Sequence, residues 1–371
     1  MQYDRPAFGD LTFPTQTIFT PYGNREHTLP KFDTPITPKE NFRRAAKREN
    51  PLWVPNHLTD FHKREFNELA SHKLGTRQGG PNFRFVAKED YTFIDPIGNS
   101  WTWVTSAGGA MLTPGTMLLE DITEWEKVIK WQNYDEWNFE EVAQDFMKNE
   151  YNPEKVMHCN IFQGCTEMLV AVLGGYGEGM LAMAEEPEAV LDFHNAIADM
   201  IIKRYDLLKK LYPLDYVTYH DDWGTERAPF FSNAMLRELV FEPTKRIVDH
   251  IHADGVFVEL HSCGNIELFM PEIVDMGFDF LQIQRRAVDI PALKEQYGDK
   301  IGFNPTFEGY VTGTSYTEEE IKAAVRKTVD LYAKGGGFYP WIFEPNSEAL
   351  WTICTELYAY SREFYDKEQG R

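Results

Sequence analysis

A histidine and a cysteine two residues apart form the feature of this sequence with the clearest chemical potential. His261 and Cys263 directly follow the apolar run GVFVEL at 255–260, which predicts a β-strand. Alternate residues at the end of a strand point the same way, so the imidazole of His261 and the thiolate of Cys263 can converge on one ion. Zinc suits this mixed pair, and a catalytic zinc site has about three protein ligands with one position open. The alternative interpretation is a packed core histidine beside an unreactive buried cysteine.

Acidic side chains follow other predicted strands. Glu167 comes after the run VMHCNIFQG, Asp222 after DYVTYH and Glu344 after GFYPWIF. In barrels of parallel strands, functional residues gather at the C-terminal ends of the strands. These carboxylates are therefore candidates for the same face as the histidine and the cysteine.

Short apolar runs alternate with helical runs from residue 215 onward, which is typical of parallel strands joined by helices. The helix that follows IGFNP begins with Thr317 and Glu320 at the spacing of a capping box. We predict an α/β fold, a (β/α)8 TIM barrel with an N-terminal elaboration. Residues 1–50 are expected to form an irregular arm with a short helix, and residues 51–371 the barrel with a small β-rich insertion near 75–120. The predicted helices of the barrel's second half are 232–253, 266–276, 290–297, 317–334 and 346–365.

Charge and composition exclude several classes of function. The chain has 371 residues, with 37 Lys and Arg against 58 Asp and Glu, and its formal net charge of −21 disfavours nucleic acid and anionic membranes as partners. The sequence has no apolar run near the roughly 20 residues of a membrane span, and its polar start does not resemble a signal peptide. We therefore expect a cytoplasmic protein. Its four cysteines do not suggest a disulfide framework there, so a special cysteine would be a metal ligand or a nucleophile.

Two long stretches resemble a known family. The segment from YHDDWG at 219–224 to LQIQ at 281–284, and GGGFYPWIFEPNSEAL at 335–350, resemble the second half of the uroporphyrinogen decarboxylase superfamily, including its zinc-dependent corrinoid methyltransferase branch. The resemblance covers about the last 200 residues and implies an enzyme. In that branch zinc is bound by a His-x-Cys pair and a third ligand, usually Cys, after the last barrel strand. The resemblance thus implies His261 and Cys263 as ligands, with Glu344 at the third position. The alternatives for that third ligand are Glu167, Asp222 and Cys354.

The decarboxylase branch fits the sequence less well. Those enzymes carry near the N-terminus an arginine segment resembling PVWxMRQAGRY, whereas this chain has PLWVPNHLTDFHKRE, with Asn56 and His57 where the arginine is expected. Asp249, His252 and Gly255 are similar to a cobalamin-binding signature but are spaced one residue too far apart. The resemblance therefore implies that the corrinoid is carried by a separate partner protein.

The combined expectation is a methyltransferase that demethylates a methoxylated aromatic compound and passes the methyl group to the cobalt of the corrinoid protein. Zinc would polarise the ether oxygen, and Asp222 or Glu167 would orient the substrate or relay a proton. Aromatic residues, 14% of the chain, would line the site; Trp53, Phe83, Phe85, Trp223 and Tyr339 are among the candidates. Three alternatives stay open: transfer from methyl-corrinoid to a thiol or tetrahydrofolate, a metal-free decarboxylase that uses Asp222, and a non-enzymatic binding barrel.

Overall fold

A computed structural model describes residues 2–20, 25–65, 90–95, 97–104, 109–131, 133, 139–161 and 163–371. The chain divides into two compact units. The first comprises Met1–Lys63, Asn152–Val156 and Asp279–Arg371, and the second Arg64–Tyr151 and Met157–Phe278. Across the described parts of the chain, no helix has the length and apolar character needed to cross a membrane.

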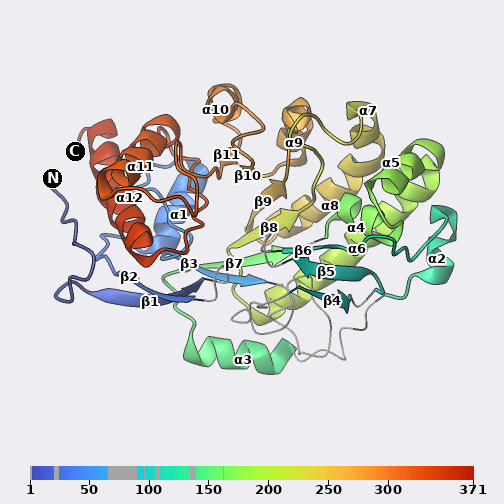
Figure 1. Cartoon of the computed structure of the whole chain (residues 1–371), viewed down its shortest axis with the longest axis horizontal. Coiled ribbons are helices and arrows are strands. Elements are labelled where there is room, and N and C mark those ends of the chain that lie inside the picture. Colours follow the sequence, from blue (N-terminus) through green and yellow to red (C-terminus); the bar gives the residue numbers. More distant parts are fainter. Residues whose placement is uncertain are drawn as a thin grey trace. The chain divides into compact units, whose positions relative to one another are not determined.

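Three parallel strands form the centre of the second unit (Figure 1). They are β7 (Val156–Ile161), β8 (Tyr216–His220) and β9 (Phe257–Ser262). Their residues are almost all buried, as expected for parallel strands covered on both faces. The ladder between β8 and β9 pairs His220 with His261, so the two strands end level with each other.

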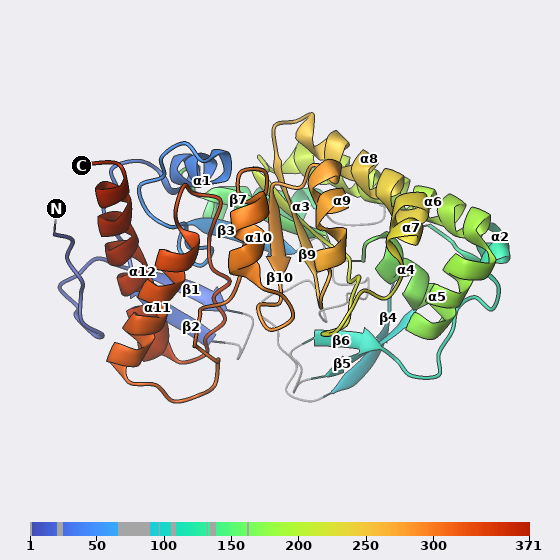
Figure 2. The same ribbon diagram turned by 90° about the horizontal axis from the view of Figure 1, so that it is seen from above.

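Helices follow each of these strands, as the sequence predicts. The long helix α6 (Pro187–Leu211) packs against α4 (Cys165–Val172) and α8 (Phe241–His252), and Figures 1 and 2 both show α6 beside α8. The helix predicted at 232–253 is present as one unbroken helical run, in which the turn at Leu236–Val240 is π-helical. The helices of this unit are α2 (Trp125–Val128), α3 (Phe139–Asn149), α4 (Cys165–Val172), α5 (Tyr176–Glu185), α6 (Pro187–Leu211), α7 (Asn233–Met235), α8 (Phe241–His252) and α9 (Met270–Met276).

A small antiparallel sheet lies within the stretch for which the sequence predicts a β-rich insertion. It consists of β4 (Tyr91–Ile94), β5 (Ser100–Val104) and β6 (Gly109–Leu112). Trp101 of β5 packs on Ala110 and Ala171 and is nearly fully buried. Residues 75–89 of the predicted insertion lie outside the described residues.

The first unit contains the arm and the last helices. The arm, predicted to be irregular, carries an antiparallel pair that the sequence analysis missed: β1 (Thr15–Thr20) and β2 (Arg25–Pro30). These strands are difficult to predict from the sequence, because prolines at both ends and polar residues throughout obscure the alternation of apolar and polar residues that is typical of a strand. The other elements of the unit are α1 (Pro38–Lys47), β3 (Phe61–Glu65), β10 (Phe280–Ile283), α10 (Ile290–Tyr297), β11 (Gly302–Phe303), α11 (Glu318–Tyr332) and α12 (Ser347–Glu368).

In this unit the predicted capping box is present, whereas the last predicted strand is almost absent. The capping box at the start of α11 is confirmed, because Thr317 and Glu320 bond to each other's main chain reciprocally. The strand predicted for GFYPWIF is reduced to a single parallel bridge between Phe303 and Phe338. Gly335–Gly337 all have positive φ and Pro340 lacks an N–H, so the segment cannot form a regular ladder.

His194 makes the stability of the second unit depend on pH. This histidine of α6 is fully buried, and its Nδ1 bonds to the main-chain oxygen of Leu239 at 2.7 Å. Burial lowers the pKa of His194 from 6.5 to about 4, against the opposite influence of the Leu239 carbonyl. Below pH 6.5 the unfolded chain therefore binds a proton that the folded chain does not, and stability falls until the pH reaches about 4.

We expect the free energy of unfolding to fall by about 2 kcal/mol through this residue when the pH is lowered from 7 to 5. In His194→Gln that part of the pH dependence should disappear, as measured by urea unfolding at both pH values. His252→Gln, at the C-terminal end of α8, is the control and should behave as the wild type does. An unchanged pH dependence in His194→Gln would contradict the assignment.

Candidate metal centre

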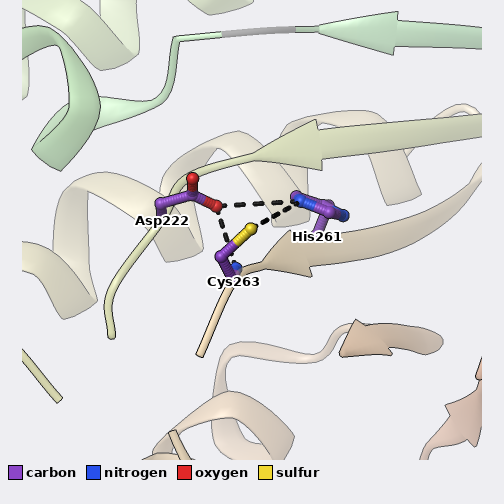
Figure 3. Close-up of side chains that lie close together, drawn as sticks. All are labelled: Asp222, His261 and Cys263. Atoms are coloured by element: carbon purple, nitrogen blue, oxygen red, sulfur yellow. Dashed lines mark hydrogen bonds and ion pairs between the residues drawn. The ribbon is translucent and has the colours of Figure 1, made fainter. Parts of the chain in front are cut away.

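Three side chains with metal-binding atoms meet where β8 and β9 end (Figure 3). Nε2 of His261 lies 3.7 Å from Sγ of Cys263 and 3.7 Å from Oδ1 of Asp222. All three ligand atoms lie within 4.8 Å of one another. The side chains of His261 and Asp222 are about one fifth exposed, which leaves the group open to a ligand from solvent.

The spacing of these atoms is close to that around a tetrahedral ion. Bonds of about 2.0–2.3 Å place a ligand nitrogen about 3.5 Å from a sulfur and about 3.3–3.5 Å from an oxygen in tetrahedral geometry. The two separations of 3.7 Å are slightly longer, so small movements of the side chains would bring the atoms onto one ion. A nitrogen, a thiolate sulfur and a carboxylate oxygen form a donor set suited to zinc. His261, Cys263 and Asp222 could therefore hold a zinc ion with a fourth position free.

The main chain fixes the arrangement before any metal binds. His261 is the penultimate residue of β9, and the parallel ladder continues past β8 because the N–H of Asp221 donates to the main-chain oxygen of His261 at 3.0 Å. The N–H of Cys263 donates to Oδ1 of Asp222 at 2.9 Å. The ring of His261 stacks on that of His220, with centroids 4.0 Å apart. His220 was not among the residues predicted from the sequence, because its place beside His261 follows from the pairing of β8 with β9.

Gly264 allows the loops after β8 and β9 to touch. Its φ is +83°, and a Cβ there would lie 2.3 Å from the carbonyl carbon and oxygen of Gly224. Main-chain atoms cannot yield as a flexible side chain can, so Ala at this position must displace one of the two loops. The adjoining Cys263 would move with it.

We expect Gly264→Ala to lose at least about 3 kcal/mol of stability and most of its metal affinity. Gly255→Ala is a matched control, because Gly255 precedes the same strand with φ +71° and has open space around its missing Cβ. That control should cost only about 1 kcal/mol and retain the metal. Thermal unfolding and metal analysis of both proteins test this; equal metal content in the two variants would contradict the role given to Gly264.

Asp221 and Asp222 turn in different directions from the end of β8. Asp221 is fully buried, and its carboxylate accepts hydrogen bonds from the N–H groups of Thr166 at 3.1 Å and Glu167 at 2.8 Å, at the start of α4. Burial raises the pKa of Asp221 to about 6, opposed by these hydrogen bonds. Gly164 is required beside it, because a Cβ there would lie 2.6 Å from Cγ of Asp221. The buried residue Glu167 is thus tied through its main chain to the residue that precedes Asp222.

The remaining sequence candidates lie in the first unit. Glu344 is buried, and its carboxylate accepts hydrogen bonds from Tyr310 and, at 2.7 Å, from the N–H of Asn346. Its role as third zinc ligand stays a prediction. Cys354 lies in α12, where Asn56 donates to its sulfur at 3.3 Å and burial raises its thiol pKa to about 12. Of the four cysteines, Cys263 is partly exposed and the other three are buried.

Several aromatic residues expected to line a substrate site are core residues instead. Trp223 is completely buried in the second unit. In the first unit Trp53 donates its indole N–H to Asp60, and Tyr339 packs against Phe42. The Phe83 and Phe85 side chains, also candidates from the sequence, lie outside the described residues. Aromatic content is therefore weak support for an aromatic substrate.

Comparisons with known proteins relate this architecture to one family. The family model for uroporphyrinogen decarboxylase (URO-D) matches residues 151–350. No curated protein sequence matches the chain significantly. Among solved structures, a methyltransferase from Methanosarcina mazei is similar over 69% of this chain and 72% of its own, with 13% identity and a TM-score of 0.53. The predicted fold class, an α/β (β/α)8 barrel, is confirmed.

Two family 10 glycoside hydrolases are more distant. A psychrophilic endo-beta-1,4-xylanase covers 63% of this chain and 70% of its own, with 10% identity and a TM-score of 0.31. An endoxylanase retrieved from a sugarcane soil metagenome covers 62% and 56%, with 12% identity and a TM-score of 0.25. TM-scores this low do not indicate a shared function.

Proposed function

The chain belongs to the uroporphyrinogen decarboxylase (URO-D) family, and from this premise we propose that it is a zinc-dependent methyltransferase that works with a separate corrinoid protein. The methyl donor is a small methylated compound, with an aromatic methyl ether as the first candidate. The single observation that carries the proposal is the group formed by His261, Cys263 and Asp222 at the ends of β8 and β9. The similar structure from Methanosarcina mazei is that of a methyltransferase, which agrees with it.

The chemistry of the donor set supports this function over a purely structural metal site. Structural zinc sites are closed by four protein ligands, whereas three ligands leave one position for a substrate atom. When bound there, zinc would supply Lewis acidity toward the substrate oxygen. The partial exposure of the His261 and Asp222 side chains agrees with access from solvent.

The protein's own residues would hold and orient the reacting groups. The hydrogen bond from the Cys263 N–H to Asp222 keeps the carboxylate beside the thiol, and the stacked ring of His220 restrains the His261 ring. Glu167, held at the start of α4 by Asp221, is the candidate for orienting the substrate or relaying a proton. Since α4 begins at Cys165, its N-terminus would place partial positive charge near the same strand ends.

The test is metal analysis of protein purified without chelator, followed by a screen of methyl donors with a Co(I) corrinoid protein. Conversion of Co(I) to methyl-Co(III), read in the absorption spectrum, with a methoxylated aromatic donor supports the proposed direction. Conversion in reverse, with a thiol or tetrahydrofolate as acceptor, would replace it with the opposite half-reaction. Absence of stoichiometric zinc would reject both.

The segment that replaces the decarboxylase arginine region disfavours porphyrinogen chemistry. Asn56 is buried and bonds to Cys354, and the ring of His57 stacks on Trp341 with centroids 4.7 Å apart. Both side chains are engaged in packing within the first unit, and neither carries the guanidinium that grips a carboxylate bidentately. Release of carbon dioxide from uroporphyrinogen by the purified protein would favour the decarboxylase alternative.

A further inference from the structure

The first unit contains a cavity of about 80 Å³ that is lined by no residue of the candidate metal centre. Its walls come from the segment that leads into β3, from Lys155 directly before β7, from Lys31 of the arm, and from Leu357 and Tyr358 of α12. We call it the entry cavity, because it lies where β3 and β7 begin. The metal centre, in contrast, lies where β8 and β9 end.

A half-buried lysine that forms no ion pair with a described residue lies in the entry cavity. Nζ of Lys155 donates a hydrogen bond to Oε1 of Gln16 at 3.0 Å. Among the residues that the structure describes, no carboxylate oxygen lies within 4.0 Å of this ammonium group. Burial lowers the pKa of Lys155; the charge of Asp60 opposes this shift, and the charge of Lys31 adds to it. A partly desolvated ammonium group without a paired anion is costly, so an anionic ligand would be stabilised here.

Neither acid in the wall forms an ion pair with Lys155, although the charge of Asp60 acts on it from a distance. Asp60 is buried, and its carboxylate already accepts hydrogen bonds from Nε1 of Trp53 at 3.0 Å, the N–H of Asn56 at 3.1 Å and the hydroxyl of Thr59 at 2.9 Å. Burial raises the pKa of Asp60, opposed by these hydrogen bonds and by the charge of Lys155. Glu154 is exposed to solvent.

Another part of the cavity wall is apolar. Trp53 and Leu357 are 1% exposed, and Tyr358 stacks on Phe32 of the arm with ring centroids 4.0 Å apart. A bound water needs about 10–15 Å³ by the same measure, so the cavity has room for a molecule of roughly five to eight non-hydrogen atoms. A ligand that fits would combine one negative group with a short hydrocarbon part.

We propose that the entry cavity binds a short-chain carboxylate, with its anionic group at Lys155 and its hydrocarbon part against Trp53 and Leu357. Bound there, the ligand would connect the arm to α12 and stabilise the first unit. The site does not depend on the metal centre or on the proposed methyl transfer. A variant without zinc, such as His261→Ala, should bind the same carboxylate equally well.

Calorimetric titration of the full chain with acetate, propionate and butyrate, at ionic strength fixed with chloride, tests the proposal. We expect affinity to rise about threefold to fourfold per methylene, because each one is buried against the apolar wall. Lys155→Met should lower butyrate affinity at least tenfold. Lys367→Met, which removes an exposed lysine of α12, should leave it unchanged. Equal affinity for the three acids, or for wild type and Lys155→Met, would overturn the proposal.

A second measurement uses the wild-type protein and does not depend on the folding of a variant. Reductive methylation of lysines, mapped by mass spectrometry, should be slowed at Lys155 by butyrate and remain unchanged at Lys367. Inorganic phosphate should protect Lys155 less, because it offers nothing to the apolar wall. If butyrate leaves the labelling of Lys155 unchanged, the entry cavity does not bind carboxylates.

Discussion

Alanine at His261 should abolish zinc binding and methyl transfer while the protein stays folded. The imidazole is the central member of the group, 3.7 Å from both other ligand atoms, and its removal leaves two ligands, too few for a stable zinc site. The side chain is one fifth exposed, so its loss opens no large core cavity. Zinc content, from about one ion per chain, should fall close to zero, and the transfer rate should drop at least about 100-fold. Elemental analysis, circular dichroism and the Co(I) assay measure these three quantities.

A matched pair of thiol variants separates metal binding from general damage. Cys263→Ser removes the partly exposed sulfur of the group and should lose zinc as His261→Ala does. Cys354→Ser changes the buried sulfur of α12 that accepts from Asn56 and should retain both zinc and activity. Full activity in a zinc-free His261→Ala protein would reject the metal mechanism altogether.

The pairing of His261 with Cys263 could be predicted from the sequence, because it depends only on the period of one strand. The place of Asp222 could not. Asp221 and Asp222 follow the same strand, and both were visible as acids at its end. The main chain beyond β8 aims Asp221 at the start of α4 and Asp222 at Cys263, and that direction depends on the register of β8 with β9.

Local patterns also predicted helices better than short strands. The capping residues and apolar periodicity of α11 lie within one segment, so its bounds followed from the sequence. The strand predicted near Phe338 depends on pairing with Phe303, which is distant in sequence and leaves no local pattern. The pair β1 and β2 lies within one short segment, but its prolines and polar residues obscure the alternation of a strand. The prediction that aromatic residues line a substrate site was wrong for Tyr339, because residue type alone does not distinguish a core position from a position that faces a substrate.

The identity of the third ligand gives the second large effect, and a pair of isosteric variants resolves it. In Asp222→Asn the amide oxygen can still accept from the N–H of Cys263, so the loop contact at 2.9 Å persists while the ligand charge is lost. We expect this variant to bind zinc at least about 100-fold more weakly, since a ligand should count for more than the outer-shell groups whose loss costs about 10–100-fold. Glu344→Gln is the parallel test of the ligand implied by family resemblance. It can keep the hydrogen bond from the N–H of Asn346, so a loss of zinc there would identify Glu344 as the ligand.

Whichever carboxylate binds, its chemistry has a consequence for the substrate. A carboxylate in place of a second thiolate gives zinc a harder ligand set and makes it a stronger Lewis acid toward oxygen. This favours activation of an ether over alkylation of a zinc-bound thiolate, which must stay nucleophilic. We therefore expect Cys in place of the identified carboxylate, Asp222→Cys or Glu344→Cys, to retain zinc and lose most ether demethylation. Undiminished demethylation in the zinc-loaded Cys variant would show that ligand hardness does not control the reaction. The residues around the fourth coordination position of the zinc would then determine which methyl donor reacts.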